Sequence, residues 1–112
     1  MGRQAELAPP KRGDVVVVDS RPALVIQNDI DNRHSPITIV AALTSQVLGE
    51  RYPTEVVLHP PEGGLTRPSA VLLNQIRSVD KKRVVGRLGR LKPETMARVD
   101  RALRISLGLV KL

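Results

Sequence analysis

The sequence of 112 residues contains no cysteine, no tryptophan and no phenylalanine, and Tyr52 is its one tyrosine. Without cysteine the chain has no disulfides, thiolate metal ligands or thiol nucleophiles. With a single tyrosine it cannot form the aromatic platform on which many proteins stack nucleic-acid bases. The core must therefore be built from Val, Leu, Ile and Ala, and a branched aliphatic core favours strands.

Histidine is almost as scarce, since His34 and His59 are the only two and lie far apart. Neither has the helical or hairpin spacing to carboxylates that a three-ligand metal site needs, so we expect no metal and no cofactor. The sequence also lacks a Gly-x-Ser-x-Gly elbow and a Gly-x-x-x-x-Gly-Lys phosphate loop. Spacing alone leaves a Ser-His-Asp triad open.

Long apolar runs are absent too, because no stretch approaches the roughly 20 residues that cross a bilayer. Residues 1–10 have no apolar run of the secretory kind, so we expect a cytoplasmic protein without membrane contact. Lys and Arg total 18 against 11 acidic residues, a formal net charge of +7. This excess favours a polyanionic or acidic partner, although a soluble protein of high isoelectric point would show the same charge.

The order of polar and apolar residues predicts a chain of short strands followed by one helix. Residues 1–10 end in two prolines and are predicted to form a flexible arm, and residues 11–112 a single domain. Pro93 suits the first turn of a helix and Gly108 its end. The pattern is typical of a mainly β antiparallel barrel, or a strongly bent sheet, with helical cover. The predicted strands are residues 15–18, 23–26, 37–43, 55–58, 70–73, 76–79 and 84–91, with a loop or short helical turn over 28–36.

The shortage of nucleophiles narrows the possible chemistry. RNA cleavage by transesterification needs no nucleophile from the protein, because the 2′-hydroxyl of the substrate attacks the neighbouring phosphate. The protein must only move protons and stabilise charge on the phosphorane. Hydrolysis of DNA, which lacks that hydroxyl, usually requires metals. The residues present therefore permit the first reaction and disfavour the second.

Several ordered motifs between Lys11 and the C-terminus together resemble one known family. They are RGDV (residues 12–15), RPALVIQND (21–29), NRHSP (32–36), IVAALTS (39–45), SAVLLNQIR (69–77) and the final VDRALRISL (99–107). In this order they resemble the MazF/PemK-type toxins of type II toxin–antitoxin modules. Each motif alone is weakly specific, and the specificity comes from their number and order.

The resemblance implies a homodimer of SH3-like, CcdB-like antiparallel β-barrels with short helices and a C-terminal helix. It implies an endoribonuclease that cuts single-stranded RNA without a metal, leaving a 2′,3′-cyclic phosphate and a 5′-hydroxyl. It also implies neutralisation by a MazE-like antitoxin with an acidic, disordered tail, which agrees with the basic charge of this chain.

Carried over to this sequence, the catalytic arginine of the family matches Arg21 and its catalytic threonine matches Thr44. Arginine is a poor proton donor or acceptor at its normal pKa, so we expect Arg21 mainly to stabilise the charge of the phosphorane. Without the resemblance, an arginine before a proline is ordinarily a solvated charge and a threonine at a strand end a turn residue. The expected RNA-binding residues are Asn28, Ser45, Gln46, Gln75 and Arg77.

The sequence departs from the family between its first two strands. Family members carry a long Gly-rich loop there that contributes an acidic residue, whereas only Asp19 and Ser20 separate Val18 from Arg21. The connection is either a tight hairpin or lacks a mobile segment. Two alternative functions therefore stay open: a catalytically weak or inactive toxin-like module that binds an acidic antitoxin peptide, and a CcdB-like gyrase poison. The second is disfavoured, because residues 108–112 contain neither aromatic nor acidic side chains.

Overall fold

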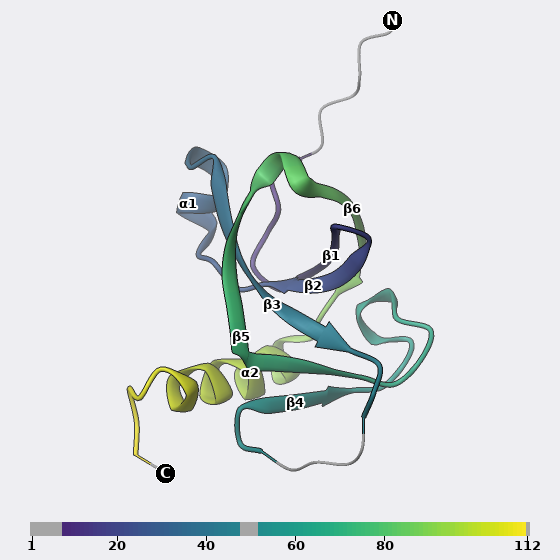
Figure 1. Ribbon diagram of the computed structural model, residues 1–112, viewed down its shortest axis with the longest axis vertical. Coiled ribbons are helices and arrows are strands. Elements are labelled where there is room, and N and C mark those ends of the chain that lie inside the picture. Colours follow the sequence, from purple (N-terminus) through teal and green to yellow (C-terminus); the bar gives the residue numbers. More distant parts are fainter. Residues whose placement is uncertain (1–7, 48–51, 112) are drawn as a thin grey trace, which may run out of the picture.

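A computed structural model describes residues 8–47 and 52–111 and shows one antiparallel sheet with a helix packed against it (Figure 1). The strand order is β4-β5-β3-β2-β1-β6. The strands are β1 (Asp14–Val18), β2 (Arg21–Val25), β3 (Ile37–Thr44), β4 (Glu55–Leu58), β5 (Ser69–Asp80) and β6 (Val84–Arg90). The helices are α1 (Asp29–His34), the single turns η1 (Glu62–Gly64) and η2 (Lys81–Arg83), and α2 (Pro93–Ser106).

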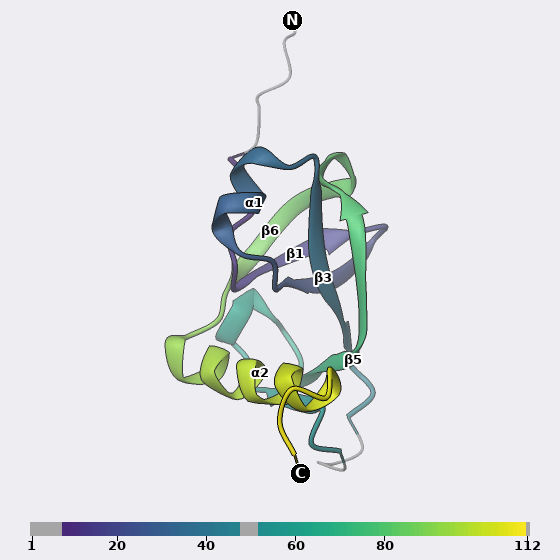
Figure 2. The ribbon, with the colours of Figure 1, turned by 90° about the vertical axis from the view of Figure 1, so that its left-hand side faces the viewer.

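The sheet is strongly bent, so that β1, β2, β3, β5 and β6 curve around a common interior (Figures 1 and 2). Its edge strands β4 and β6 do not pair with each other, and the sheet is therefore open. Helix α2 packs on β4 and β5. The mainly β antiparallel prediction with a C-terminal helix is confirmed, in its bent-sheet form.

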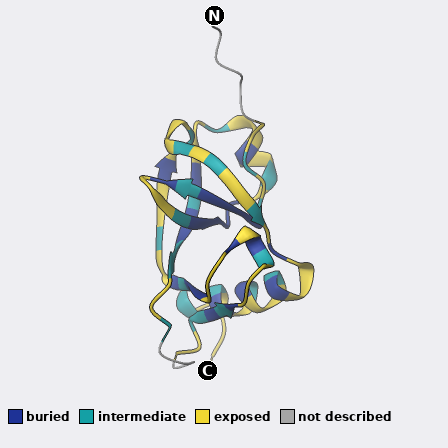
Figure 3. Cartoon of the chain, turned by 90° about the vertical axis from the view of Figure 1, so that its right-hand side faces the viewer, coloured by how far each residue is buried: buried dark blue, intermediate teal, exposed yellow. Residues whose placement is uncertain are grey.

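Strand β1 is covered on both of its faces, which explains its continuous valine run. Val15 and Leu24 belong to a helix-side core that also contains Val99 of α2. The next residues along β1, Val16 and Val18, belong to a strand-side core inside the curved strands. Alternate residues of a strand point to opposite faces, so a run without polar interruption is needed where neither face meets water. Buried residues also line the side of α2 that faces the sheet (Figure 3).

Strand β5 differs from the prediction, which divided it into two strands. It runs without a break for 12 residues. Its register against β3 shifts, because Ala41 pairs with Ile76 whereas Ala42 pairs with Leu72. Such a shift is a bulge, which bends a strand without ending it. The exposed pair Asn74 and Gln75 lies in this bulge and produced the appearance of a turn.

The connection between β1 and β2 is a tight hairpin. Val18 pairs with Arg21, and both intervening residues have positive φ, 52° at Asp19 and 67° at Ser20. Two such residues form the type I′ turn, whose twist matches that of the flanking strands. Asp19 and Ser20 are therefore sufficient to close a hairpin between β1 and β2.

A buried polar network fixes α1 against the sheet. Asn32 is fully buried and its Nδ2 donates to the Gln27 carbonyl oxygen at 2.9 Å. The hydroxyl of Thr38 on β3 donates to Asn32 Oδ1 at 2.7 Å. The segment predicted as a loop or one helical turn is therefore a short helix tied to β3.

Two further predictions concern the N-terminal arm and the lack of a membrane-spanning segment. Most of the predicted N-terminal arm, residues 1–7, lies outside the described residues, so the boundary at Lys11 stays a prediction. Within the described ranges, no helix is long and apolar enough to cross a membrane.

Candidate functional site

Arg21 and Thr44 lie at neighbouring strand ends. Arg21 begins β2 and Thr44 ends β3. These strands pair with Ala23 opposite Ala42, and continuing that register by two residues brings Arg21 opposite Thr44. Cross-strand partners project from the same face of a sheet, so both side chains are available to one ligand.

Two grooves meet at this pair. The first, here called the loop groove, has a volume of about 640 Å³ and is also lined by Ser45, Gln46 and Arg67. The second, here called the sheet groove, has a volume of about 420 Å³ and is also lined by Gln75 and Arg77. Arg21 and Thr44 line both grooves. A chain-like ligand could therefore follow one groove, pass the pair and continue into the other.

The sheet groove opens beside the strand-side core. Val18, Ala23 and Val40 belong to that core and also line the groove. Its floor is therefore held by packed aliphatic side chains, while Gln75 and Arg77 are exposed. A rigid apolar floor with polar side chains above it is typical of a binding surface.

The wall of the loop groove depends on a close contact between two backbones. Gly64 and Leu88 both line this groove. A Cβ atom on Gly64, whose φ is +71°, would lie 1.9 Å from the Leu88 carbonyl oxygen. Only glycine fits there, so η1 rests directly on β6 and sets the width of the groove.

The two central side chains differ in their hydrogen bonding. The guanidinium of Arg21 is exposed and forms no ion pair with any described residue. The hydroxyl oxygen of Thr44 accepts a hydrogen bond from the Gln46 backbone N–H at 3.1 Å. That bond uses an acceptor lone pair and leaves the Thr44 O–H free to donate. The pair thus offers a cation and a hydrogen-bond donor, which suit an anionic ligand.

Of the predicted RNA-binding residues, Asn28 alone lines neither groove. Its Oδ1 accepts from the Asp31 backbone N–H at 2.9 Å, and its Nδ2 donates to Asp31 Oδ2 at 3.0 Å. Asn28 therefore caps α1, which is an ordinary role for asparagine at that position. An RNA contact by Asn28 stays a prediction without support from its place in the fold.

Sequence reasoning missed three charged residues near the grooves. Arg67 lines the loop groove, and its only sequence signal is a basic residue shortly after the turn at Gly63 and Gly64. Asp19 and Arg83 form an ion pair across 64 positions of the chain. The Arg83 guanidinium, the main cause, and that of Arg77 lower the pKa of Asp19 below its ordinary value. No sequence pattern brings these residues together.

A bent antiparallel sheet with a C-terminal helix, and two grooves that share Arg21 and Thr44, place the chain in the class of small SH3-like β domains. A family model described as "PemK-like, MazF-like toxin of type II toxin-antitoxin system" matches residues 5–107. The chain therefore belongs to the PemK/MazF toxin family, which confirms the resemblance seen in its motifs.

Individual relatives agree with the family match. Endoribonuclease EndoA of Bacillus subtilis (strain 168) is 45% identical over 111 residues, covering 89% of this chain and 96% of the relative. A solved structure of an endoribonuclease from a mycobacterial species has 30% identity and a TM-score of 0.82, covering 95% of this chain and 98% of that one. A mycobacterial endoribonuclease in complex with its cognate antitoxin has 30% identity and a TM-score of 0.80, with coverages of 92% and 99%.

Proposed function

We propose that this chain is a metal-independent endoribonuclease toxin that cleaves single-stranded RNA, mRNA in particular. The observation that carries the proposal is the pairing of Arg21 and Thr44 where the two grooves meet. The relatives described above are named endoribonucleases, which supports the same activity here.

The reaction follows from what the two side chains offer. The 2′-hydroxyl of the RNA attacks the adjacent phosphorus and loses its proton, and the bond to the 5′-oxygen of the next nucleotide breaks as that oxygen gains a proton. The products are a 2′,3′-cyclic phosphate and a 5′-hydroxyl. Arg21 stabilises the charge on the phosphorane, and the Thr44 hydroxyl donates to a phosphate oxygen.

The grooves give the RNA a path on either side of the reacting phosphate. Ser45 and Gln46 contact it in the loop groove, and Gln75 and Arg77 in the sheet groove. The formal charge of +7 favours binding of the phosphate backbone. With few aromatic side chains, base selection must depend on amides, hydroxyls and arginine planes.

The biological setting is part of the same proposal. The chain forms a homodimer in the cytoplasm, and a MazE-like antitoxin with an acidic, disordered tail neutralises it. The mycobacterial relative solved with its cognate antitoxin supports this partner. An acidic tail also suits the basic surface of this chain.

Incubation of the chain with one long single-stranded RNA in excess EDTA tests the activity. Wild-type protein should produce cuts at discrete sites, and Arg21→Ala should lower the rate by at least about 10²- to 10³-fold, the usual effect of removing one charge-stabilising donor. Arg21→Lys should restore little, because an ammonium cannot bridge two phosphate oxygens in the plane of a guanidinium.

Arg33→Ala is the matched control, since Arg33 is an exposed arginine of α1 that lines neither groove. It removes the same charge and should leave the cleavage rate within about twofold. Wild-type protein that leaves the RNA intact would refute the proposal.

A catalytically inactive, toxin-like module is the second candidate, favoured by the two-residue hairpin that replaces the long loop of the family. Binding of an acidic antitoxin peptide without any RNA turnover would support it. The gyrase-poison hypothesis gains nothing from the relatives described above, which are endoribonucleases.

A further inference from the structure

Asp19, at the tip of the β1–β2 hairpin, binds two arginines from elsewhere in the chain. Its Oδ1 accepts from Arg83 Nε at 3.2 Å, and its Oδ2 accepts from a terminal nitrogen of the same guanidinium. A terminal nitrogen of Arg77 lies 3.4 Å from Oδ2. One carboxylate is thus shared by guanidiniums from β5 and η2.

This cluster adjoins the sheet groove. Val18, which precedes Asp19, and Arg77 both line the groove, so the carboxylate lies just beyond its edge. All three charged side chains remain accessible, with exposed fractions of 47% for Asp19, 54% for Arg77 and 45% for Arg83. A ligand that leaves the groove on this side would meet them directly.

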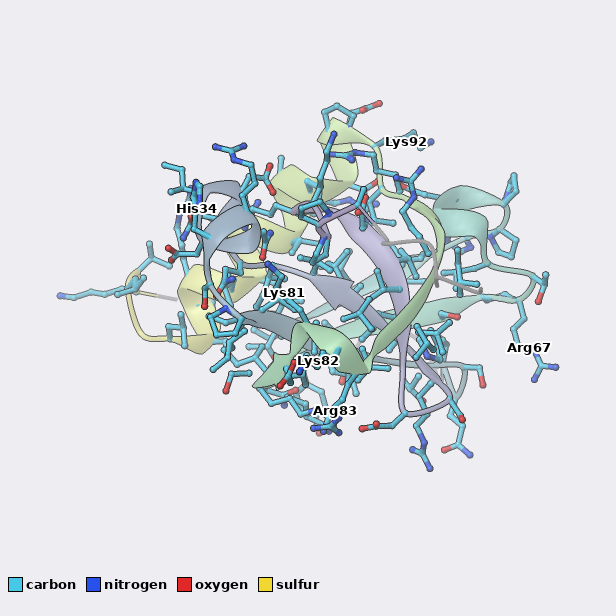
Figure 4. The ribbon with its side chains drawn as sticks, turned by 90° about the horizontal axis from the view of Figure 1, so that it is seen from above. His34, Arg67, Lys81, Lys82, Arg83 and Lys92 are labelled. Carbon is cyan, nitrogen blue, oxygen red and sulfur yellow. The ribbon has the colours of Figure 1, made fainter. Side chains whose placement is uncertain are left out.

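The backbone that carries Arg83 is anchored. Lys81 Nζ donates to the Asn32 carbonyl oxygen at 2.6 Å, and the Lys81 backbone N–H donates to the Pro36 carbonyl oxygen at 2.9 Å. The side chains of Lys81, Lys82 and Arg83 gather at the end of the molecule where β5 turns into β6 (Figure 4). The sheet groove is therefore continued by a fixed, basic turn.

We propose that Arg77 and Arg83 form a phosphodiester-binding pair that extends the RNA path beyond the sheet groove, and that the Asp19 carboxylate occupies this pair until an RNA phosphate displaces it. The inference rests on the proposed function. Two guanidiniums converging on one oxyanion suit the two non-bridging oxygens of a phosphodiester as well as they suit a carboxylate. Exposed ion pairs are weak, so the exchange costs little.

Asp19 then lowers the affinity for RNA in two ways. It engages two cations that would otherwise bind phosphate, and its own charge repels the backbone. Removing the charge should strengthen RNA binding and steepen its dependence on salt, because more counterions are released when freed arginines meet phosphates.

Asp19→Asn is the variant of choice, since asparagine tolerates the positive φ of this turn and is common in type I′ hairpins. Asp80→Asn is the matched control. Asp80 is exposed, lies near Arg83 and accepts from the Lys82 backbone N–H, a capping role that asparagine also fills. It removes one negative charge from the same region and keeps the ion pairs of Arg77 and Arg83 with Asp19.

The probe is a fluorescent single-stranded RNA carrying 2′-O-methyl groups throughout, which the chain can bind and cannot cleave. Anisotropy titrations of the full chain over a range of salt should show about 3- to 10-fold tighter binding for Asp19→Asn and less than about twofold for Asp80→Asn. In an Arg77→Ala/Arg83→Ala background, Asp19→Asn should have no more effect than Asp80→Asn.

Equal effects of the two single variants, weaker binding by Asp19→Asn, or no binding to the probe by any variant would overturn the inference. Cleavage of unmodified RNA is measured in parallel. Wild-type cleavage with equal affinities of the two variants leaves the proposed function intact and removes the inference. Tighter binding by Asp19→Asn without any cleavage supports the arginine pair and removes the ribonuclease activity.

Discussion

Thr44 has one hydroxyl that the fold and the proposed chemistry both use. Its oxygen accepts from the Gln46 backbone N–H, which shapes the start of the loop after β3, while its hydrogen remains for the ligand. Thr44→Val keeps the shape of the side chain and removes both functions. We expect the rate of RNA cleavage to fall by about 10²- to 10³-fold, or roughly 3–4 kcal/mol of transition-state stabilisation.

Thr44→Ser is the control, because serine keeps the hydroxyl and loses only the methyl group of threonine. It should retain most of the activity when RNA cleavage by the three proteins is compared under single-turnover conditions. A Thr44→Val protein that cleaves as fast as wild type would show that the hydroxyl has no part in the chemistry.

At the residue scale, the sequence singled out Arg21 and Thr44 as candidates because each lies in a motif that resembles the family, and the structure places both on the same two grooves. Arg67 and Arg83 could not be predicted. Arg67 lines the loop groove and Arg83 pairs with Asp19 only through the fold, and in the sequence an arginine after a turn looks like any solvated charge. Asn28 is the opposite case, since an amide beside a strand end also caps α1, and sequence alone does not distinguish this role from RNA binding.

At the element scale, the hairpin between β1 and β2 carries both Asp19 and Arg21, and its second turn residue is strained. Ser20 has a φ of 67°, a conformation that costs a residue with a Cβ about 1 kcal/mol or more. Ser20→Gly removes this cost and gives the Asp-Gly pair that type I′ turns favour. We expect the free energy of unfolding to rise by about 0.5–1 kcal/mol and the Tm by about 3–6 °C.

Ser20→Ala is the comparison, because alanine keeps the Cβ and gains no freedom at positive φ. Thermal and urea unfolding of the three proteins should rank Ser20→Gly above the other two. If Ser20→Gly proved no more stable than wild type, the two-residue turn would not have the backbone described here.

Sequence patterns located most elements of this fold and misjudged β5. Alternation and turn residues mark where a strand can end, and Asn74 with Gln75 supplied both signals. Whether the chain turns there or bulges depends on the neighbouring strand, and β3 is long enough to pair on both sides of the irregularity. The same information about partners decides whether a bent sheet closes, and here β4 and β6 stay apart.

At the scale of the whole molecule, two carboxylates join parts of the chain that are distant in sequence. Asp29 of α1 accepts from the Arg12 backbone N–H at 2.7 Å, and this hydrogen bond is the main reason that its pKa is lowered. Burial pushes the pKa of Glu62 upward, but hydrogen bonds from the Thr95 side chain and the Lys92 backbone N–H outweigh burial and lower it. Glu62 thereby ties η1 to the start of α2.

Both pKa values are lower in the folded than in the unfolded chain, so the free energy of unfolding falls when the carboxylates are protonated. The stability that these carboxylates contribute is complete above the unfolded pKa, near 4, and is lost as the pH falls through the folded values. The Tm should therefore decline as the pH is lowered from about 5 toward 3. In an Asp29→Asn/Glu62→Gln protein the Tm should be lower at pH 7 and its acid decline shallower.

Asp31→Asn/Glu94→Gln is the matched control, since Asp31 and Glu94 are exposed carboxylates in the first turns of α1 and α2. It makes the same change in charge without breaking the links from α1 to Arg12 and from η1 to α2. Calorimetry at several pH values should show the wild-type acid decline in the control and a reduced one in the Asp29→Asn/Glu62→Gln protein. Equal declines in all three would mean that acid acts through the general positive charge of the chain and not through these two links.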